Sequence, residues 1–176
     1  KFFSLIVKKF KAVAFVPGNH DLWLVKGDKT SKDSVAKFER ILALCKQYGV
    51  HTSPHLFEGE GGSVKVWLVP LFSWYSEVFD DDESTKGERI RREMWCDYLN
   101  CKWPERVIEE DTETPSTPTG SPELFFLNQN LASIELVRQH CESDPSAMII
   151  SFSHFLPRRE CFPRKDDLPE YRRFLP

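Results

Sequence analysis

The sequence has no excess of positive charge, no apolar run long enough to cross a membrane, and no regular set of cysteines. Its 24 Lys and Arg are outnumbered by 27 Asp and Glu, which gives a formal net charge of -3. We therefore expect no nucleic-acid surface, because such a surface needs an excess of basic side chains. The apolar opening at residues 2–7 is far shorter than the ~20 residues that span a bilayer, so no membrane segment is expected. The 5 Cys are irregularly spaced, which indicates reduced thiols and an intracellular, cytoplasmic protein.

Three segments lack the spacing of known ligand-binding motifs. The glycine-rich run at 59–62 is not followed by the Lys-Ser or Lys-Thr of a phosphate-binding loop, so it predicts a turn. The acidic cluster at 80–83 lacks the alternating ligands of an EF-hand and predicts a solvated loop. Cys96 and Cys101 have no second pair at matching spacing that would complete a zinc site.

Strands and helices alternate along a chain whose length suits one domain. With 40% hydrophobic residues, 14 Phe and 5 Trp, the 176 residues can bury a core. The alternation predicts an α/β fold, in which helices pack outside a sheet. Residues 110–122 are rich in Thr, Ser and Pro, so a disordered insertion is expected there. The expected elements are a helix end at 2–7, a strand at 12–16, a helix at 32–48, hairpin strands at 56–58 and 64–69, helices at 86–100 and 128–141, and a strand at 147–152.

The tetrapeptide Gly18-Asn19-His20-Asp21 follows a short apolar strand and a proline. Polar side chains at the carboxyl end of a strand lie where open α/β sheets bind their ligands. The Asn19 carbonyl oxygen suits a hard metal ion, and the His20 imidazole either binds metal or transfers a proton near neutral pH. The alternative for Asn19 is a left-handed turn conformation after Gly18.

A second polar turn follows the strand at 147–152 and contains Ser153 and His154. Taken by itself, one interpretation of His154 is a core histidine whose ring nitrogens find partners within the protein. Both polar turns come after apolar strands. We therefore predict that Asn19 and His154 lie close together, although 135 positions (154 minus 19) separate them.

These two blocks together resemble the calcineurin-like metallophosphoesterases, which carry a GNH(D/E) signature and, well downstream, a Gly/Ser-His pair. The resemblance implies a four-layer α/β/β/α sandwich with two central sheets between outer helices. It also implies a binuclear centre of divalent metal ions such as Mn, Fe or Zn, with Asn19 and His154 as ligands of the same ion. His20 would contact the phosphate of a phosphate ester substrate and protonate the leaving group. Asp21 would hold the His20 ring by hydrogen bonding.

The family's Asp-x-His and Gly-Asp-x-x-Asp motifs, which precede the signature, and its closing Gly-His-x-His motif do not occur in this sequence. We therefore interpret residues 1–176 as the central part of a single metallophosphoesterase domain, with any targeting sequence expected upstream. The implied function is metal-dependent hydrolysis of phosphate mono- or diesters, with this fragment inactive alone. The alternative is a non-catalytic binding or interaction protein on the same scaffold.

Three further groups of residues are weaker candidates. His51 and His55 are four positions apart, but the flanking Gly and Pro predict a loop, which does not align two ligands as a helix face does. His140 is expected at the end of a helix, where the helix dipole favours a cation. Arginines after the His154 turn either contact a phosphate or face solvent: Arg158, Arg159 and Arg164.

Overall fold

The computed structural model places most of the chain. The expected helix start at 86–95, the acidic cluster at 80–83, the insertion at 110–120 and the three arginines after His154 lie outside the described residues. The described residues are 2–25, 30–59, 61, 64–75, 96–104, 107, 121–156 and 161.

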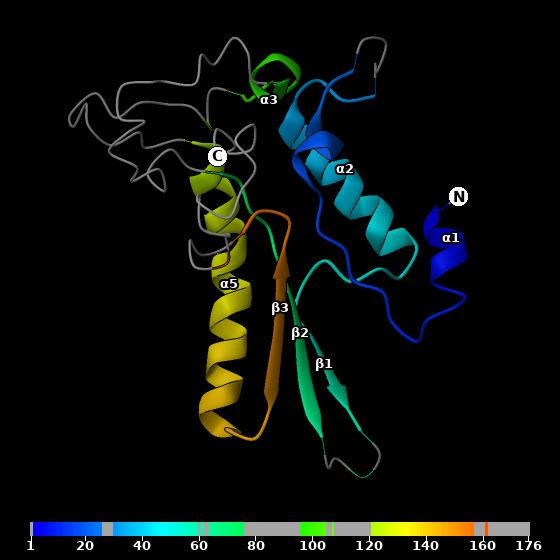
Figure 1. Cartoon of the computed structure of the whole chain (residues 1–176), viewed down its shortest axis with the longest axis vertical. Coiled ribbons are helices and arrows are strands. Elements are labelled where there is room, and N and C mark those ends of the chain that lie inside the picture. The colour runs from blue at the N-terminus through cyan, green and yellow to red at the C-terminus, as the bar shows by residue number, and fades with distance from the viewer. Residues whose placement is uncertain are drawn as a thin grey trace, which may run out of the picture.

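The order of helices and strands follows the predicted alternation (Figure 1). The elements are helix α1 (Phe2–Ile6), a 3-10 turn (Asn19–Leu22), helix α2 (Ser34–Gln47), strands β1 (His55–Glu58) and β2 (Lys65–Leu71), helices α3 (Cys96–Asn100) and α5 (Pro122–Ser143), and strand β3 (Met148–Ser153).

The described strands form a three-stranded sheet in the order β1-β2-β3. β1 and β2 are antiparallel, with Leu56 opposite Trp67, so the predicted hairpin is confirmed. β3 pairs with β2 in parallel, with Ile149 opposite Trp67, which confirms the strand predicted at 147–152. A parallel pair needs a crossover connection, and α5 lies in it (Figure 1). The carboxyl ends of β2 and β3 therefore lie at the same edge of the sheet.

Helix α2 confirms the helix predicted at 32–48 and lies within two residues of each predicted end. The Asp33 side chain accepts a hydrogen bond from Ala36 N at 2.7 Å and caps the first turn. Gly49 follows the last turn with a φ of 68°, a conformation that glycine adopts without strain.

Helix α5 begins earlier than the predicted residue 128. Ser121 caps it by accepting from Leu124 N at 3.3 Å, and Pro122 lies in the first turn. Proline suits this position because its φ is already helical and its missing N–H is not needed there. Ser121 and Pro122 therefore belong to the helix start, and their assignment to the insertion was wrong.

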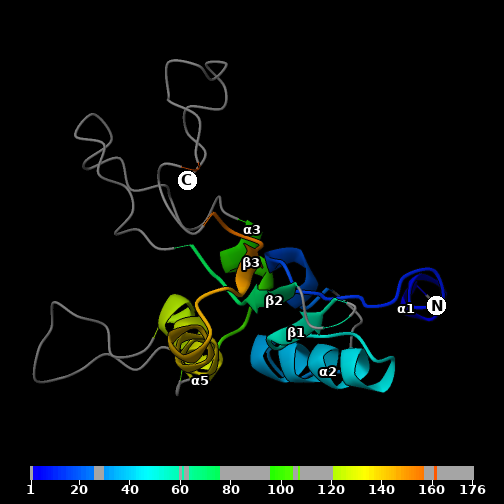
Figure 2. The ribbon, with the colours of Figure 1, turned by 90° about the horizontal axis from the view of Figure 1, so that it is seen from below.

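Helices α2 and α5 lie side by side on one face of the sheet (Figure 2). The rings of Phe38 in α2 and Phe126 in α5 meet with centroids 5.3 Å apart. Val137 of α5 packs on β2. In the part of the chain that the structure describes, buried apolar side chains form two clusters. Leu22, Phe38, Trp74 and Phe126 make up the first, and Trp67, Val69 and Val137 the second.

The segment at 12–16 is extended, but the prediction of a full strand was wrong. Ala14 forms a single parallel bridge with His51. Phe15 N donates to His51 O at 2.9 Å, and His51 N donates to Val13 O at 2.8 Å. Among the described residues, His51 is the only bridge partner of this segment, so the pairing does not extend into a longer strand.

The α/β class predicted from the sequence is confirmed by the mixed sheet and its helices. The four-layer arrangement is not confirmed, because the described strands form one sheet of three. In the placed part of the chain, no helix combines the length and the apolar character that crossing a bilayer demands.

Candidate functional site

The tetrapeptide at 18–21 forms a tight turn whose end is anchored in the core. Leu22 is 1% exposed and belongs to the first apolar cluster. The Gly18 N–H donates to the Asp21 carboxylate at 2.8 Å, and the Asp21 N–H donates to Gly18 O at 3.1 Å. This reciprocal pair fixes the start of the 3-10 turn. The Asn19 side chain is half-buried and His20 is exposed, so both remain accessible.

Asn19 and His154 meet, as predicted from their positions after apolar segments. His154 Nε2 lies 2.9 Å from Asn19 Oδ1, although 135 positions separate the residues. Two ligands at about 2.1 Å from one ion and at right angles to each other are about 3.0 Å apart. The separation therefore fits two neighbouring positions around one metal ion. It also fits a hydrogen bond from Nε2–H to Oδ1.

Gly18 provides the space in which the His154 ring lies. A Cβ atom at position 18 would be 2.6 Å from His154 Cε1 and 2.8 Å from both ring nitrogens. The Gly18 backbone has a φ of -90° and a ψ of 176°, so it is extended and any residue could adopt it. Glycine is required here by the close approach of the imidazole and not by the backbone conformation.

Asp97 and Trp23 complete the surroundings of Asn19. Asn19 Nδ2 donates to both carboxylate oxygens of Asp97 at 2.9 Å. Trp23 Nε1 also donates to this carboxylate. Asp97 is only 3% exposed, which is rare for an aspartate unless it is well hydrogen-bonded. Sequence reasoning missed both residues, because 78 positions separate Asn19 from Asp97 and no motif surrounds the latter.

The His20 imidazole lies against the Trp23 indole, with ring centroids 3.8 Å apart and an interplanar angle of 32°. The contact restricts the ring while His20 stays exposed to solvent. The Asp21 carboxylate, which was predicted to hold His20, accepts from the Gly18 N–H instead. The chemical roles of His20 and Asp21 stay predictions, and Trp23 is the side chain seen in contact with the His20 ring.

The side chains of Tyr75 and Cys101 behind this turn are partly buried and lie near the negative charge of Asp97. Burial raises the pKa of the Cys101 thiol to about 12, and the Asp97 charge adds to the effect. Burial also raises the pKa of the Tyr75 hydroxyl, with further contributions from Tyr98 and Asp97. A buried carboxylate makes stronger hydrogen bonds than one in water, so the Asp97 carboxylate should hold the Asn19 amide and the Trp23 indole firmly in place.

The donor set fits part of a metal site. Asn19 and His154 supply an oxygen and a nitrogen, which Mn, Fe and Zn accept as ligands. Among the placed residues, no three His, Cys, Asp or Glu side chains gather closely enough to hold an ion. The described side chains therefore fit as two ligands of one ion and do not complete a centre.

The other candidate histidines lie apart from this pair. The rings of His51 and His55 lie with their centroids 4.0 Å apart and their planes tilted by 32°. Burial, and then the nearby His55, lowers the pKa of His51. His140 lies in the last turn of α5, as predicted, and meets Trp67 edge to face at 5.1 Å.

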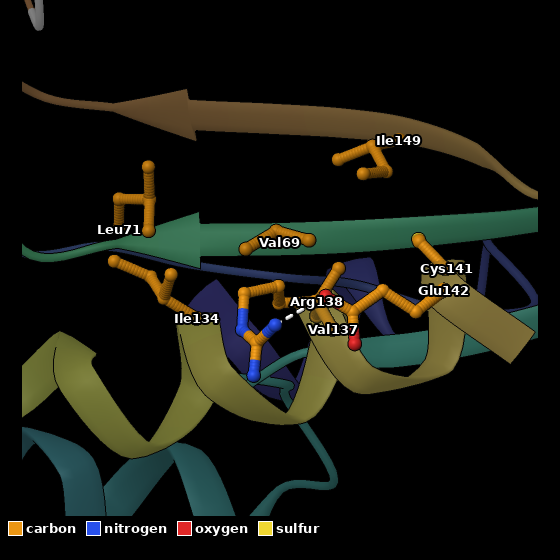
Figure 3. Close-up of a pocket in the computed structure, with 8 residues that line it drawn as sticks. All are labelled: Val69, Leu71, Ile134, Val137, Arg138, Cys141, Glu142 and Ile149. Carbon is orange, nitrogen blue, oxygen red and sulfur yellow. Dashed lines mark hydrogen bonds and ion pairs between the residues drawn. The ribbon is translucent and has the colours of Figure 1, made fainter.

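A groove between α5 and strands β2 and β3 shares no residue with the Asn19–His154 pair. Its volume is about 480 Å³, and Figure 3 shows its apolar walls with Arg138 and Glu142 paired at the side. Ile149 at its edge is 52% exposed, and its neighbours Met148 and Ile150 are exposed to a similar extent. The groove is lined by Val69, Leu71, Ile134, Val137, Arg138, Cys141, Glu142 and Ile149.

Comparison with known proteins relates the chain to a phosphate ester hydrolase. Over 91 aligned residues it is 32% identical to the acyl-carrier-protein phosphodiesterase PptH of Mycobacterium tuberculosis. The alignment covers 49% of this chain and 28% of PptH, so the chain spans well under a third of that protein's length. No protein-family model matches the chain, and no solved structure matches it. The chain is thus similar, over about half its length, to an enzyme that hydrolyses a phosphodiester.

Proposed function

We propose that this chain carries part of the active site of a metal-dependent phosphoesterase. The single observation that carries the proposal is the 2.9 Å approach of His154 Nε2 to Asn19 Oδ1. The contact brings together the two sequence blocks on which the family resemblance rests. The similarity to a phosphodiesterase supports the same reaction class. The four-layer sandwich expected of such an enzyme remains part of the proposal.

In this proposal Asn19 Oδ1 and His154 Nε2 hold one divalent ion of a binuclear centre. Such ions, when bound, stabilise charge on the phosphoryl group and lower the pKa of water. Gly18 leaves the His154 ring its place beside Asn19. Two ligands do not hold a pair of ions. The 176 residues expressed alone are therefore expected to hydrolyse phosphate esters poorly.

His20 supplies the proton in the proposed reaction. The oxygen of water adds to phosphorus, the ester P–O bond breaks, and an imidazole nitrogen of His20 donates its proton to the departing oxygen. The attacking water releases one proton to solvent, and a proton from solvent restores the imidazole. The exposure of His20 and its contact with Trp23 support this role, because a proton donor must reach the substrate while keeping a fixed orientation. Asp21 serves the reaction by closing the turn through the Gly18 N–H.

The test uses the protein expressed from the complete reading frame that contains this sequence. We expect Mn²⁺-dependent hydrolysis of bis(p-nitrophenyl) phosphate or p-nitrophenyl phosphate, reduced at least 100-fold, roughly, by Asn19→Ala. Asn128→Ala is the matched control, because Asn128 is exposed on α5 and should leave hydrolysis unchanged. Wild-type turnover by Asn19→Ala would contradict the proposed site.

The second candidate function is a non-catalytic interaction protein. The apolar groove of Figure 3 and its exposed Ile149 favour it, because exposed apolar patches commonly mark binding surfaces. It predicts no hydrolysis of either ester by the complete protein with Mn²⁺, Fe²⁺ or Zn²⁺. The same assay therefore separates the two candidates.

A further inference from the structure

A buried carboxylate lies directly behind the Asn19 amide. Both oxygens of Asp97 are 2.9 Å from Asn19 Nδ2. An ionised carboxylate can only accept hydrogen bonds, so the NH₂ group of Asn19 has to face Asp97. The carbonyl oxygen at the other end of the amide then faces His154 Nε2 at 2.9 Å. The contact with Asp97 therefore decides which atom Asn19 presents to His154.

We propose that Asp97 is a positioning residue, whose carboxylate fixes the Asn19 amide so that Oδ1, and not Nδ2, lies beside His154. The inference rests on the proposed function, in which Oδ1 is a metal ligand. An amide turned by half a rotation would offer an NH₂ group, which has no lone pair free for a metal. Mutation of a group that orients a metal ligand typically lowers metal affinity about 10–100-fold.

The same carboxylate reaches His20 through Trp23. The Trp23 indole N–H donates to Asp97, and the indole ring lies against the His20 imidazole at 3.8 Å between centroids. One buried group thus fixes the amide that would hold the metal and the ring that restrains the proton donor. Hydrogen bonds to an ionised acceptor are about twice as strong as neutral ones, which suits this double role.

Backbone hydrogen bonds hold the segment that carries Asp97. Leu24 N donates to Asn100 O at 2.7 Å, just beyond the 3-10 turn. Ser34 N donates to Lys102 O at 2.8 Å at the start of α2. Residues 96–102 are therefore attached to two neighbouring elements independently of the Asp97 side chain. A change confined to that side chain tests amide orientation while this framework persists.

The first test is Asp97→Asn in the protein from the complete reading frame. Asn at 97 keeps the shape but replaces one acceptor oxygen with NH₂, so the Asn19 amide gains a partner by flipping. With ¹⁵N-labelled asparagine, the side-chain amide signals of Asn19 should shift in the metal-free protein, because the charge-assisted hydrogen bond is lost. Mn²⁺ affinity, measured by the electron paramagnetic resonance of free Mn²⁺, should fall about 10–100-fold.

Asp33→Asn is the matched control for the loss of a buried carboxylate. Asp33 is 7% exposed and caps α2 through Ala36 N. Asn is an equally good cap, so the fold is kept. Asp33 is hydrogen-bonded to the α2 backbone, so both the Asn19 signals and the Mn²⁺ affinity should stay at their wild-type values.

An exchange of the two side chains gives a second test. Asn19→Asp alone sets two carboxylates against each other and should lower both the melting temperature and Mn²⁺ affinity. Adding Asp97→Asn restores an amide-carboxylate contact with the partners exchanged, and an oxygen again faces His154. Recovery of both quantities in the double variant supports the inference even where Asp97→Asn alone is unstable.

Two results would overturn the positioning role. One is an Asp97→Asn variant with unchanged Asn19 signals, and the other is a double variant that recovers neither quantity. Failure of the proposed function looks different. In that case the wild-type protein shows no Mn²⁺ binding that depends on Asn19, while the Asn19 amide signals still respond to Asp97→Asn.

Discussion

Gly18→Ala should remove His154 from its place beside Asn19 without unfolding the protein. The new Cβ would lie 2.6 Å from His154 Cε1, whereas ordinary contacts begin at 3.4 Å. To reach an ordinary contact distance the ring must therefore retreat by 0.8 Å, the difference between these two distances. Metal-ligand distances tolerate changes of only about 0.2 Å. In the proposed site, the displaced imidazole should therefore no longer share an ion with Asn19 Oδ1.

The energetic cost to the fold should be small. The extended backbone of Gly18 accepts alanine without strain, and Gly-to-Ala changes at such positions stabilise by about 0.4–1 kcal/mol through the unfolded state. His154 is exposed and can rotate away, at a cost of about 0.5–1.5 kcal/mol if its new conformation is off-rotamer. These terms nearly cancel, so the free energy of unfolding should change by less than about 1 kcal/mol.

The assay combines urea denaturation with a Mn²⁺ titration followed by electron paramagnetic resonance. Gly49→Ala is the converse control, because Gly49 has a φ of 68° and open space around it. The Gly49→Ala variant should lose about 1–2 kcal/mol in the free energy of unfolding and should bind Mn²⁺ with unchanged affinity. Gly18→Ala should keep stability and lose at least 10-fold, roughly, in affinity. Wild-type affinity in Gly18→Ala would refute the placement of His154 or its role as a ligand.

Three further predictions concern the histidines, a thiol and the core. In the protein from the complete reading frame, His20→Ala should lower turnover about 10²–10⁴-fold while the bound metal content stays unchanged. His154→Ala should lower both the turnover and the bound metal content. Metal analysis and turnover on the same samples decide this, and the opposite pattern would exchange the two roles. Burial raises the pKa of Cys45 to about 11, so only about 1 in 1000 of its thiols is ionised at pH 8. Iodoacetamide should therefore label the exposed Cys96 and Cys161 before Cys45 in mass spectrometry, and labelling of Cys45 at the same rate in the native protein would contradict its burial. Phe126 is 2% exposed, so Phe126→Ala should lower the free energy of unfolding by about 3–5 kcal/mol in urea denaturation. Truncating an exposed leucine of the same helix should change it by less than about 0.5 kcal/mol.

Elements set by short-range interactions were predictable from the sequence. The bounds of α2 follow from a capping aspartate and a glycine that accepts a positive φ, both visible in the sequence. The hairpin follows from two β-rich runs around a glycine-rich turn. The start of α5 was missed because Pro122 was assigned to the preceding Pro-rich segment, although proline is equally at home in the first turn of a helix.

Long-range polar contacts were predictable only where strand ends imply them. The proximity of Asn19 and His154 was predicted correctly, but partly from a strand at 12–16 that is a single bridge. The Asp97 contact had no such signal. A lone aspartate in a polar, helix-compatible segment usually faces solvent. Its burial depends on how residues 96–102 attach to the 3-10 turn and to α2, and this packing is tertiary.

At three of the four tetrapeptide positions, contacts within the protein explain why the residue is needed. The fourth, His20, has no such structural requirement in the part of the chain that the structure describes. Gly18 is needed because the His154 ring occupies the space of a side chain. Position 19 needs a group with a donor at one end for Asp97 and an acceptor at the other for His154, and an aspartate there would face a second carboxylate. Asp21 closes the turn by accepting from the Gly18 N–H. Within the tetrapeptide, His20 is the residue whose exposed ring is not needed to build the turn, which is the property expected of the group that meets the substrate.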